Sequence, residues 1–268
     1  MLDIIIVGGG PAGLSAAITA RLRNNSVTII SNDKTGTGLY KAPLVENYPG
    51  LPGISGADLI ERLTEHSADA GACLITGKVT TILPVGGVFN IGYGSDILAS
   101  KSVILAIGAA QTSLFPGEEE LLGRGVSYCA TCDGMLFRGK RICVVCQSPD
   151  AEEEAGYLES IGCEVVRVCT RDVRIIGEKR VTSVFDGGEE IKCDGVFIFR
   201  QAVAPHLLLA GLETDRGYIR VSQAGETSIK GVFAAGDCVG KPHQIAKAVG
   251  EGQVAALSAN EYIREKEI

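Results

Sequence analysis

The first thirty residues divide into an apolar run, a glycine-rich stretch, a stretch with a helical pattern and a second apolar run. This is the order expected of a strand, a turn, a helix and a second strand. A run at 2–7 that is apolar except for Asp3 is typical of a buried parallel strand, and a glycine-rich loop follows it at once. The next stretch, from Ala12 to about Arg23, has the pattern of a helix, and a second strand is expected at 26–30. Together these elements predict a βαβ unit.

A second unit of the same kind begins in the middle of the chain. Its first strand is expected at 141–145, its helix at about 150–160 and its second strand at 164–168. Shorter strands are expected near 179–185 and 196–199. Two βαβ units, each with its own parallel strands, indicate an α/β protein.

The pattern of the first unit returns near the C-terminus, where two short strands precede a long helix at about 244–264. We therefore predict an α/β fold with two Rossmann-like three-layer domains. The first domain is discontinuous and consists of residues 1–110 and 213–268. A smaller, shortened second domain, residues 111–212, is inserted into it.

Composition and charge narrow the function classes. The 268 residues are 46% hydrophobic and 21% charged, the balance of an ordinary globular protein. The net charge of −7 argues against nucleic acid as a partner, because phosphate binding needs a basic field. No apolar run reaches the roughly 18 residues of a membrane helix, and a strand that starts at about Asp3 leaves no room for a signal peptide. We expect a cytoplasmic protein that binds neither nucleic acid nor membranes.

The loop after the first strand reads Gly8-Gly9-Gly10-Pro11-Ala12-Gly13. Its Gly-x-Gly-x-x-Gly spacing, between a strand and a helix, is the dinucleotide-binding fingerprint. The first Gly allows the tight turn, the second lets the backbone approach a pyrophosphate, and the third lets helix and strand pack closely. The helix N-terminus then faces the anion. A glycine-rich turn without a ligand is the alternative, but strand, loop and helix all agree with nucleotide binding.

Cys129 and Cys132 form a Cys-x-x-Cys motif between the two βαβ units. Such a motif is half of a zinc site, a redox disulfide or two unrelated buried thiols. The nearest further zinc ligands, Cys143 and Cys146, lie three apart on a predicted strand and so point to opposite faces. We favour the redox interpretation, in which a thiolate attacks, and expect no metal. Asp133 is placed to act as general acid–base for the pair, although Asp-Gly is also an ordinary turn dipeptide.

The chain resembles the low-molecular-weight thioredoxin reductases, a family of flavin disulfide reductases, along nearly its full length. The segments that carry the resemblance stand in the family's order: Gly8–Gly13, Val45–Gly50, Ala106–Gly108, Gly123–Ser127, Cys129–Gly134 and Gly231–Asp237. The resemblance implies FAD as cofactor, thioredoxin as substrate and a homodimer. It also implies that Cys132 is the thiol next to the flavin and that Cys129 attacks the disulfide of the protein substrate.

The resemblance also assigns residues to the cofactor. Asn47 would lie beside the isoalloxazine and Asp237 would bind the ribityl or pyrophosphate region of FAD. Gln244 would sit under the flavin at the start of the last helix, where the positive end of the helix dipole favours the anionic reduced form. The full predicted set is Gly8, Gly10, Pro11, Ala12, Gly13, Ser31, Asn47, Ala106, Gly108, Gly236, Asp237, His243, Gln244 and Ile245.

Two positions depart from the family's pattern. An acidic residue at the end of the second strand usually binds the adenosine ribose. Here that place is taken by Ser31, with Asp33 two residues later, and either could bind a ribose hydroxyl. The family usually has Arg before the Gln of the last helix, whereas this chain has His243.

The loop of the second βαβ unit lacks the glycines. NADPH-dependent relatives carry Gly-x-Gly-x-x-Ala there, and this chain has Cys146, Ser148 and Ala151 at the same positions. The first two have Cβ atoms where the backbone must approach a pyrophosphate, and Pro149 removes a backbone N–H from the anion cradle. Glu152–Glu154 add negative charge to the first helical turn. We therefore predict that the chain does not bind NAD(P)H.

Other features of the second unit agree with this loss. Of the basic cluster that binds the 2′-phosphate in relatives only Arg171 remains, and the domain is shortened between Arg174 and Val181. The chain is most similar to the pyridine-nucleotide-independent, ferredoxin-dependent flavin thioredoxin reductases, which implies reduced ferredoxin as the electron donor.

Ferredoxins are acidic, so a docking patch for them should be basic despite the net charge of −7. Two groups of residues qualify, and each taken singly is better interpreted as a solvated charged face. The candidate groups are Arg138, Lys140 and Arg141, and Arg167, Arg171, Arg174, Lys179 and Arg180.

Three other functions fit the sequence. An NADPH-dependent thioredoxin reductase with a divergent loop would still be reduced by NADPH. A disulfide oxidoreductase with another flavin in the inserted domain would hold two FAD per chain. An FAD-containing redox sensor without turnover would fail to reduce thioredoxin whatever the donor, but it would have no need of an intact Cys-Ala-Thr-Cys-Asp-Gly motif.

Overall fold

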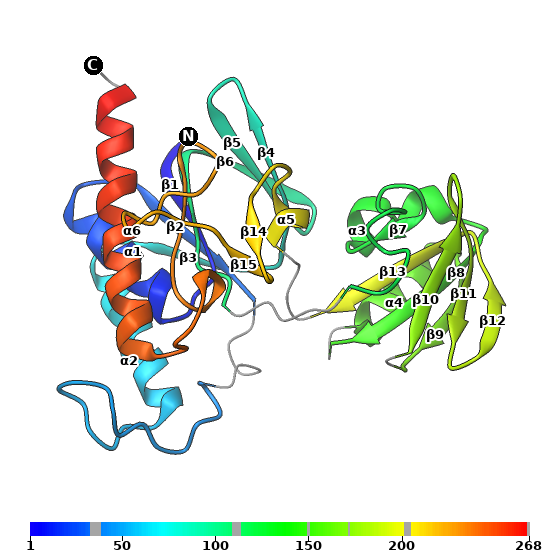
Figure 1. Ribbon diagram of the computed structural model, residues 1–268, viewed down its shortest axis with the longest axis horizontal. Coiled ribbons are helices and arrows are strands. Elements are labelled where there is room, and N and C mark those ends of the chain that lie inside the picture. Colours follow the sequence, from blue (N-terminus) through cyan, green and yellow to red (C-terminus); the bar gives the residue numbers. More distant parts are fainter. Residues whose placement is uncertain (33–38, 109–113, 149–150, 171, 201–204, 267–268) are drawn as a thin grey trace. The chain divides into compact units, whose positions relative to one another are not determined.

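The chain folds into two compact units, each with its own sheets and core (Figure 1). The computed structural model describes residues 1–32, 39–108, 114–148, 151–170, 172–200 and 205–266, without the side chains of Cys132 and Arg200. Unit 1 is Met1–Gln111 together with Ala204–Ile268, and unit 2 is Thr112–Val203.

The chain re-enters unit 1 earlier than the sequence pattern predicts, at residue 204 and not at 213. The reason is helix α5 (Pro205–Leu208), which packs against strand β4 (Val79–Val85) of unit 1. Leu212, just after the helix, is also buried. This apolar stretch is too short to show a helical period, so the pattern placed it with the inserted unit.

Unit 1 is built on a seven-stranded sheet. Its strands are β1 (Leu2–Val7), β2 (Val27–Ser31), β3 (Cys73–Thr76), β4, β5 (Val88–Tyr93), β6 (Asp96–Leu105) and β16 (Val232–Ala234). Strands β3, β2, β1, β6 and β16 follow one another in this order and are parallel. The first half of β6 pairs instead with the antiparallel β4–β5 hairpin. The carboxyl ends of the parallel strands therefore meet at one edge of the sheet.

Helices α1 (Pro11–Leu22), α2 (Gly56–Asp69) and α6 (Ile245–Lys266) pack on the same face of this sheet. α1 and α6 lie side by side (Figure 1). Their close approach depends on Gly252, where a Cβ atom would come within 2.1 Å of the carbonyl oxygen of Ala12. The remaining elements of unit 1 are the small β14–β15 hairpin (Thr214–Asp215 and Tyr218–Ile219) and the 3-10 turn η2 (Asp237–Val239).

Unit 2 has a four-stranded parallel sheet in the order β7-β13-β8-β9. Its strands are β7 (Val126–Ser127), β8 (Arg141–Gln147), β9 (Glu164–Val168) and β13 (Gly195–Arg200). Between β7 and β8 lie the short helix α3 (Ala130–Asp133) and the 3-10 turn η1 (Gly134–Phe137). Helix α4 (Ala151–Ser160) covers one face of the sheet.

An antiparallel meander covers the other face, formed by β10 (Val173–Gly177), β11 (Val181–Asp186) and β12 (Glu189–Lys192). Alternate residues of β8 enter the two cores: Ile142 and Val144 pack with α4, and Cys143 and Val145 pack with the meander. The α/β fold class is confirmed, and the third layer of unit 2 is this meander. Among the described helices of both units, none is long and apolar enough to cross a membrane.

Candidate functional site

The glycine loop between β1 and α1 contains two kinds of glycine. A Cβ atom on Gly8, which has a φ of +112°, would lie 2.2 Å from the carbonyl oxygen of Ala106. A Cβ atom on Gly13 would lie 1.9 Å from the carbonyl oxygen of Gly8. A Cβ atom on Gly10 would meet nothing within 4 Å. The protein itself therefore requires Gly8 and Gly13, whereas Gly10 faces open space.

Helix α1 begins at this open space. Gly10 is its N-cap and Pro11 occupies its first turn, which holds no acidic residue. Since Gly10 has no side chain with which to cap the helix, the first backbone N–H groups are left for a ligand. A helix N-terminus of this kind favours an anion such as a pyrophosphate.

Several predicted cofactor residues gather around this loop at the carboxyl edge of the sheet. Ala106 contacts the loop through Gly8, and Gly236, two residues after the end of β16, lies against the Cβ atom of Ala12. Ser31 ends β2 and is half-buried at the same edge, where its hydroxyl donates to the carbonyl oxygen of Asn32. The remaining members at this edge are Gly108 after β6 and Asp237 after Gly236. Asp33 lies outside the described residues.

The loop after β16 is held by two residues of α6 that the sequence analysis missed. The carboxylate of Glu251 accepts a hydrogen bond from the Gly236 N–H at 3.0 Å. The ammonium of Lys247 donates to the carbonyl oxygen of Gly240 at 2.9 Å and to Glu251 at 2.9 Å. The sequence could have indicated this pair, because a Lys and a Glu four residues apart lie on the same face of a helix.

Asn47 and Gln244, predicted to lie at the flavin, are in contact although 197 residues separate them in sequence. The Asn47 amide nitrogen donates to the Gln244 side-chain oxygen at 2.9 Å, and both residues are exposed. His243 lies beside Tyr218, with 3.4 Å between Nε2 and the phenol oxygen. Ile245 is the first residue of α6.

Cys238, next to Asp237, is a free cysteine that is not part of the Cys-x-x-Cys motif. It is buried, and its sulfur donates to the carbonyl oxygens of Ala235 and Leu105 at 3.2 and 3.4 Å. Burial raises the pKa of Cys238 to about 12. This cysteine stays protonated at neutral pH and serves packing.

The redox motif of unit 2 follows β7. Cys129 is disulfide-bonded. The backbone of Cys132 lies in α3, and its side chain is outside the described part of the structure. The buried hydroxyl of Ser127 donates to the Asp133 carboxylate at 2.6 Å and accepts the backbone N–H of Cys129 at 3.2 Å. Ser127 thus connects the predicted acid–base residue to the disulfide, and sequence reasoning gave it no role.

A buried carboxylate fixes the strand that leads to the disulfide. Glu118 is fully buried and accepts the phenol hydrogen bond of Tyr128 at 2.9 Å and the backbone N–H of Phe115 at 2.8 Å. Buried acids need such partners, because removal from water disfavours their charged form. The sequence shows Glu118 only as one acidic residue in a turn, and nothing in the local pattern indicates that it is buried.

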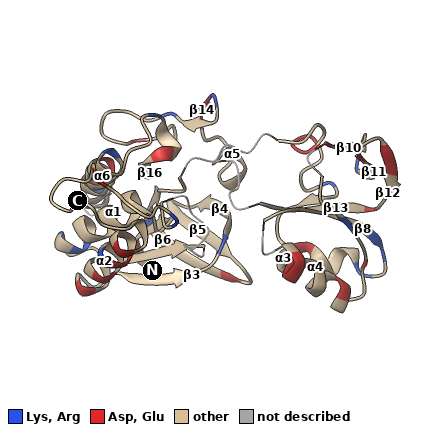
Figure 2. Cartoon of the chain, turned by 90° about the horizontal axis from the view of Figure 1, so that it is seen from below, with Lys and Arg blue, Asp and Glu red and all other residues tan. Residues whose placement is uncertain are grey.

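The second βαβ loop joins β8 to α4 at the carboxyl edge of the unit 2 sheet. The first turn of α4 holds Glu152, Glu153 and Glu154, so this helix end is acidic (Figure 2). Arg167 of β9 binds Glu152 at 2.9 Å and Glu159 at 2.6 Å. Cys146 lies within strand β8 and not in the loop, Ser148 follows the strand, and Pro149 and Arg171 lie outside the described residues. The described part of this loop offers an anion neither glycine nor a free helix N-terminus of the kind seen at Gly10.

The basic residues of unit 2 are partly engaged. Arg141 pairs with Glu164 at 3.2 Å, and Lys140 lies 5.4 Å from the centre of the Phe137 ring. Arg174 lies 5.4 Å from the centre of the Phe185 ring. Arg138, Lys140 and Arg141 are exposed, so their charges remain available to an acidic partner.

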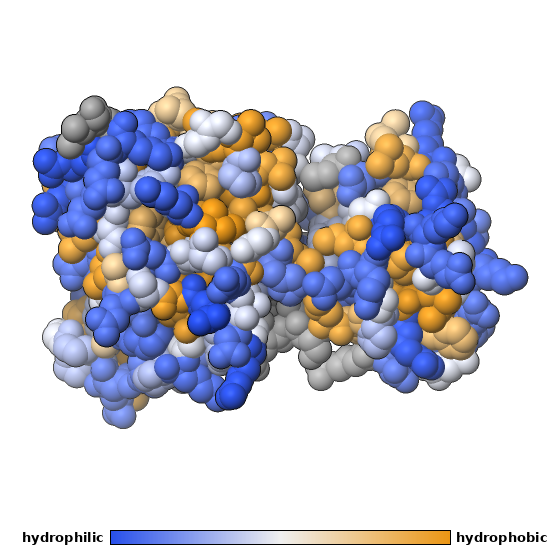
Figure 3. Space-filling model, turned by 45° about the horizontal axis from the view of Figure 1, so that its top comes forward, coloured by the Kyte–Doolittle hydropathy of each residue, from blue (hydrophilic) through white to orange (hydrophobic). Residues whose placement is uncertain are grey.

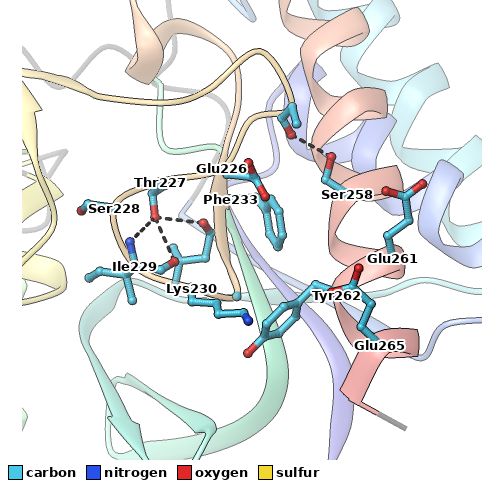
Figure 4. Close-up of a pocket in the computed structure, with 13 residues that line it drawn as sticks. Glu226, Thr227, Ser228, Ile229, Lys230, Phe233, Ser258, Glu261, Tyr262 and Glu265 are labelled. Atoms are coloured by element: carbon cyan, nitrogen blue, oxygen red, sulfur yellow. Dashed lines mark hydrogen bonds between the residues drawn. The ribbon is translucent and has the colours of Figure 1, made fainter. Parts of the chain in front are cut away.

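A pocket of about 380 Å³ in unit 1 is separate from the glycine loop (Figure 4). It is lined by Gly231 and Val232, at the amino end of β16, and by Tyr262 and Glu261 of α6. Because β16 runs parallel to β6 and β1, its amino end lies at the edge of the sheet opposite to the carboxyl ends. None of the predicted cofactor residues lines this pocket.

Comparisons with known proteins agree with this arrangement. The model of the pyridine nucleotide-disulphide oxidoreductase family matches residues 2–175 and 166–252. A thioredoxin reductase of Bacillus subtilis is 33% identical over 300 aligned positions, which cover 98% of this chain and 95% of the relative.

Two solved structures of a ferredoxin-flavin thioredoxin reductase from Clostridium acetobutylicum are similar over nearly the whole chain. One has a TM-score of 0.89 at 36% identity and covers 99% of this chain and 98% of its own. The other has a TM-score of 0.85 at 39% identity and covers 98% of each chain.

Proposed function

This chain belongs to the thioredoxin reductases of the pyridine nucleotide-disulphide oxidoreductase family, and on that premise we propose that it reduces thioredoxin with electrons from reduced ferredoxin and not from NAD(P)H. The observation that carries the proposal is the contrast between the two βαβ loops. The loop at Gly10 is open and neutral, whereas the second unit has Cys146, near the end of β8, and Ser148, just after it, in place of glycines, and its loop runs into three glutamates.

FAD is the cofactor, and the residues of unit 1 fit it. The open space at Gly10 and the free N-terminus of α1 would hold the pyrophosphate, as argued above. Ser31 would bind the adenosine ribose, and Asp237 would bind the ribityl region. Asn47 and Gln244 would orient the ring. When bound, FAD accepts electrons from a one-electron donor and delivers them as a pair to a disulfide.

The chain's own residues would carry the disulfide exchange. Reduction of the Cys129–Cys132 disulfide consumes two electrons and two protons. The Cys129 thiolate then attacks the thioredoxin disulfide and forms a mixed disulfide, and Cys132 resolves it, so that thioredoxin leaves with two thiols. Asp133, held by the Ser127 hydroxyl, would transfer the protons.

Apolar side chains next to the redox motif would bind the protein substrate. Apolar residues reach the surface on the face drawn in Figure 3, on both units. Met135 and Leu136, directly after α3, are 56% and 68% exposed. Exposed apolar groups of this size are common at contact sites.

The loss of the second loop leaves this family member without its usual donor, which is why we propose ferredoxin. The two Clostridium acetobutylicum structures support the proposal, because a ferredoxin-flavin thioredoxin reductase has the same fold at 36–39% identity. A homodimer in the cytoplasm is part of the same proposal and follows from the family resemblance.

The relay is tested with Cys132→Ser. In this variant we expect FAD to bind and to be reduced by ferredoxin, while thioredoxin reduction falls at least 100-fold. A matched control is Cys73→Ser, which removes an exposed free cysteine of unit 1 and should leave turnover unchanged. Thioredoxin reduction at the wild-type rate by Cys132→Ser would overturn the assignment of the relay.

A further inference from the structure

A second pair of thiols meets where the lost nucleotide loop begins. Parallel strands β8 and β9 pair residue by residue up to Val145 and Val168, so the next residues in register are Cys146 and Cys169. Just beyond this ladder, the Gln147 side-chain amide donates to the carbonyl oxygen of Thr170 at 3.0 Å and links the ends of the two strands. The Cys146 sulfur donates to the carbonyl oxygen of Val144 at 3.7 Å, and the Cys169 thiol is near enough to Cys146 to help raise its pKa.

The two thiols of this pair differ in exposure. Cys146 is half-buried beside the core under α4, whereas Cys169 is exposed. Burial, followed by the nearby Cys169 thiol, raises the pKa of Cys146 to about 11. Cys169 is therefore the thiol that a reagent in solution reaches first.

A disulfide between these positions is sterically feasible. Neighbouring strands lie about 4.8 Å apart, and disulfides join Cα atoms that are about 4.4–6.8 Å apart. Cys169 comes directly after the last residue of β9, so the ladder of the sheet does not fix its backbone on both sides. Small adjustments there can bring the two sulfur atoms to bonding distance.

Another thiol pair in unit 2 provides an internal comparison. Cys143 and Cys193 also lie together, but both are buried in the core under the meander. The nearby Cys193 thiol and burial hold the pKa of Cys143 far above its usual range. This second pair is closed to reagents, so proximity and accessibility occur together at Cys146 and Cys169.

We propose that Cys146 and Cys169 form a second redox-active dithiol, independent of the Cys129 disulfide, which is oxidised by exchange with a small-molecule disulfide. The Cys169 thiolate attacks the reagent's S–S bond and forms a mixed disulfide, and one thiol leaves. Cys146 then gives up its proton, attacks the Cys169 sulfur and displaces the second thiol. The protein loses two electrons and two protons, which the reagent gains as two thiols. The new bond joins the ends of β8 and β9.

The test uses the FAD-loaded protein, first reduced with dithiothreitol and desalted without oxygen. It is incubated with oxidised glutathione in one arm and with oxidised thioredoxin in the other, then alkylated, digested and analysed by mass spectrometry. With glutathione we expect a Cys146–Cys169 cross-linked peptide at least tenfold more abundant than a Cys143–Cys193 peptide. After denaturation, the number of free thiols should fall by two in addition to the thiols that are lost when the Cys129–Cys132 disulfide re-forms.

Two outcomes would overturn the proposal. One is separate alkylation of Cys146 and Cys169 under conditions that reoxidise Cys129. The other is a cross-link formed with thioredoxin but not with glutathione, because the reagent is then a protein and not a small molecule. The electron donor that reduces the flavin takes no part in this assay. If no Cys146–Cys169 cross-link forms, the proposed function is therefore unaffected.

Variants test the order of attack. In Cys146→Ala, Cys169 should accumulate as a mixed disulfide with glutathione, because no thiol resolves it. In Cys169→Ser, which changes an exposed residue, the half-buried Cys146 should react at least tenfold more slowly than Cys169 does in the wild type. If Cys146 in Cys169→Ser reacted with glutathione as fast as Cys169 does in the wild type, the proposed roles would be contradicted. This result does not depend on whether Cys146→Ala folds.

Discussion

At the scale of single residues, Gly10 and Gly13 lie three positions apart in one loop but have different neighbours. The space beside Gly13 is filled by the carbonyl oxygen of Gly8, whereas the space beside Gly10 is open. The Gly-x-Gly-x-x-Gly spacing predicted that the loop binds a dinucleotide. It could not show which glycine serves packing and which serves the ligand, because that depends on how the folded loop places Gly13 against the backbone of Gly8.

Gly10→Ala should therefore affect the cofactor and not the fold. Its φ of −82° suits alanine and no protein atom is in the way, so we expect an unchanged Tm for the cofactor-free protein. FAD affinity should fall about tenfold or more, which corresponds to ~1.4 kcal/mol. Gly13→Ala is the matched control and should lower stability by about 1–3 kcal/mol or more. Full FAD binding by Gly10→Ala, measured by fluorescence titration, would contradict this account.

Ser127 is the residue whose function emerged only from the structure. Ser127→Ala removes the hydroxyl that donates to Asp133, and a hydrogen bond to a charged group contributes about 1.5–3 kcal/mol. We expect kcat for thioredoxin reduction to fall about tenfold, with a changed pH profile. Ser183→Ala is the control, since Ser183 is also buried in unit 2 and donates to a carboxylate, Glu190, at 2.7 Å. Equal kcat values for the two variants would remove Ser127 from the mechanism.

At the scale of elements, the sequence pattern predicted both βαβ units because each first strand is a largely apolar run that a loop and a helical stretch follow. Helix α2 was missed, although Ser55 caps it by accepting the Asp58 N–H, and Ser-x-x-Asp is a readable start signal. Strand β11 was predicted near 179–185, but its hairpin partner β12 was missed, and the signal for it was the Gly187-Gly188 turn. The contact between Asn47 and Gln244 has no local signal at all, because it depends on how distant segments fold together.

The contact between α1 and α6 yields a prediction about packing. Gly252→Ala would place a Cβ atom 2.1 Å from the carbonyl oxygen of Ala12, so the helices must separate. We expect a loss of about 1–3 kcal/mol in unfolding free energy, together with weaker FAD binding, because α1 carries the glycine loop. Gly250→Ala lies in the same helix with nothing within 4 Å and should stabilise the protein by about 0.5–1 kcal/mol. Urea unfolding of both variants decides, and equal stabilities would refute the packing argument.

At the scale of the whole molecule, the net charge of −7 opposes an acidic donor unless a basic patch guides it. We predict that the rate of flavin reduction by ferredoxin falls several-fold as salt rises from about 0.05 to 0.3 M, because screening weakens a local attraction. Two triple glutamine variants locate the patch: one at Arg138, Lys140 and Arg141, the other at Arg174, Lys179 and Arg180. One of them should flatten the salt dependence. A rate that rises with salt, or no effect of either variant, would exclude both patches.

The central claim concerns the electron donor, and one measurement tests it directly. The oxidised protein is mixed without oxygen with NADPH in one experiment and with reduced ferredoxin in another, while the flavin absorbance is followed. The account predicts rapid bleaching by ferredoxin and none by NADPH on the timescale of turnover. Rapid bleaching by NADPH would mean that the loop after β8 still binds a nicotinamide cofactor and would contradict the account.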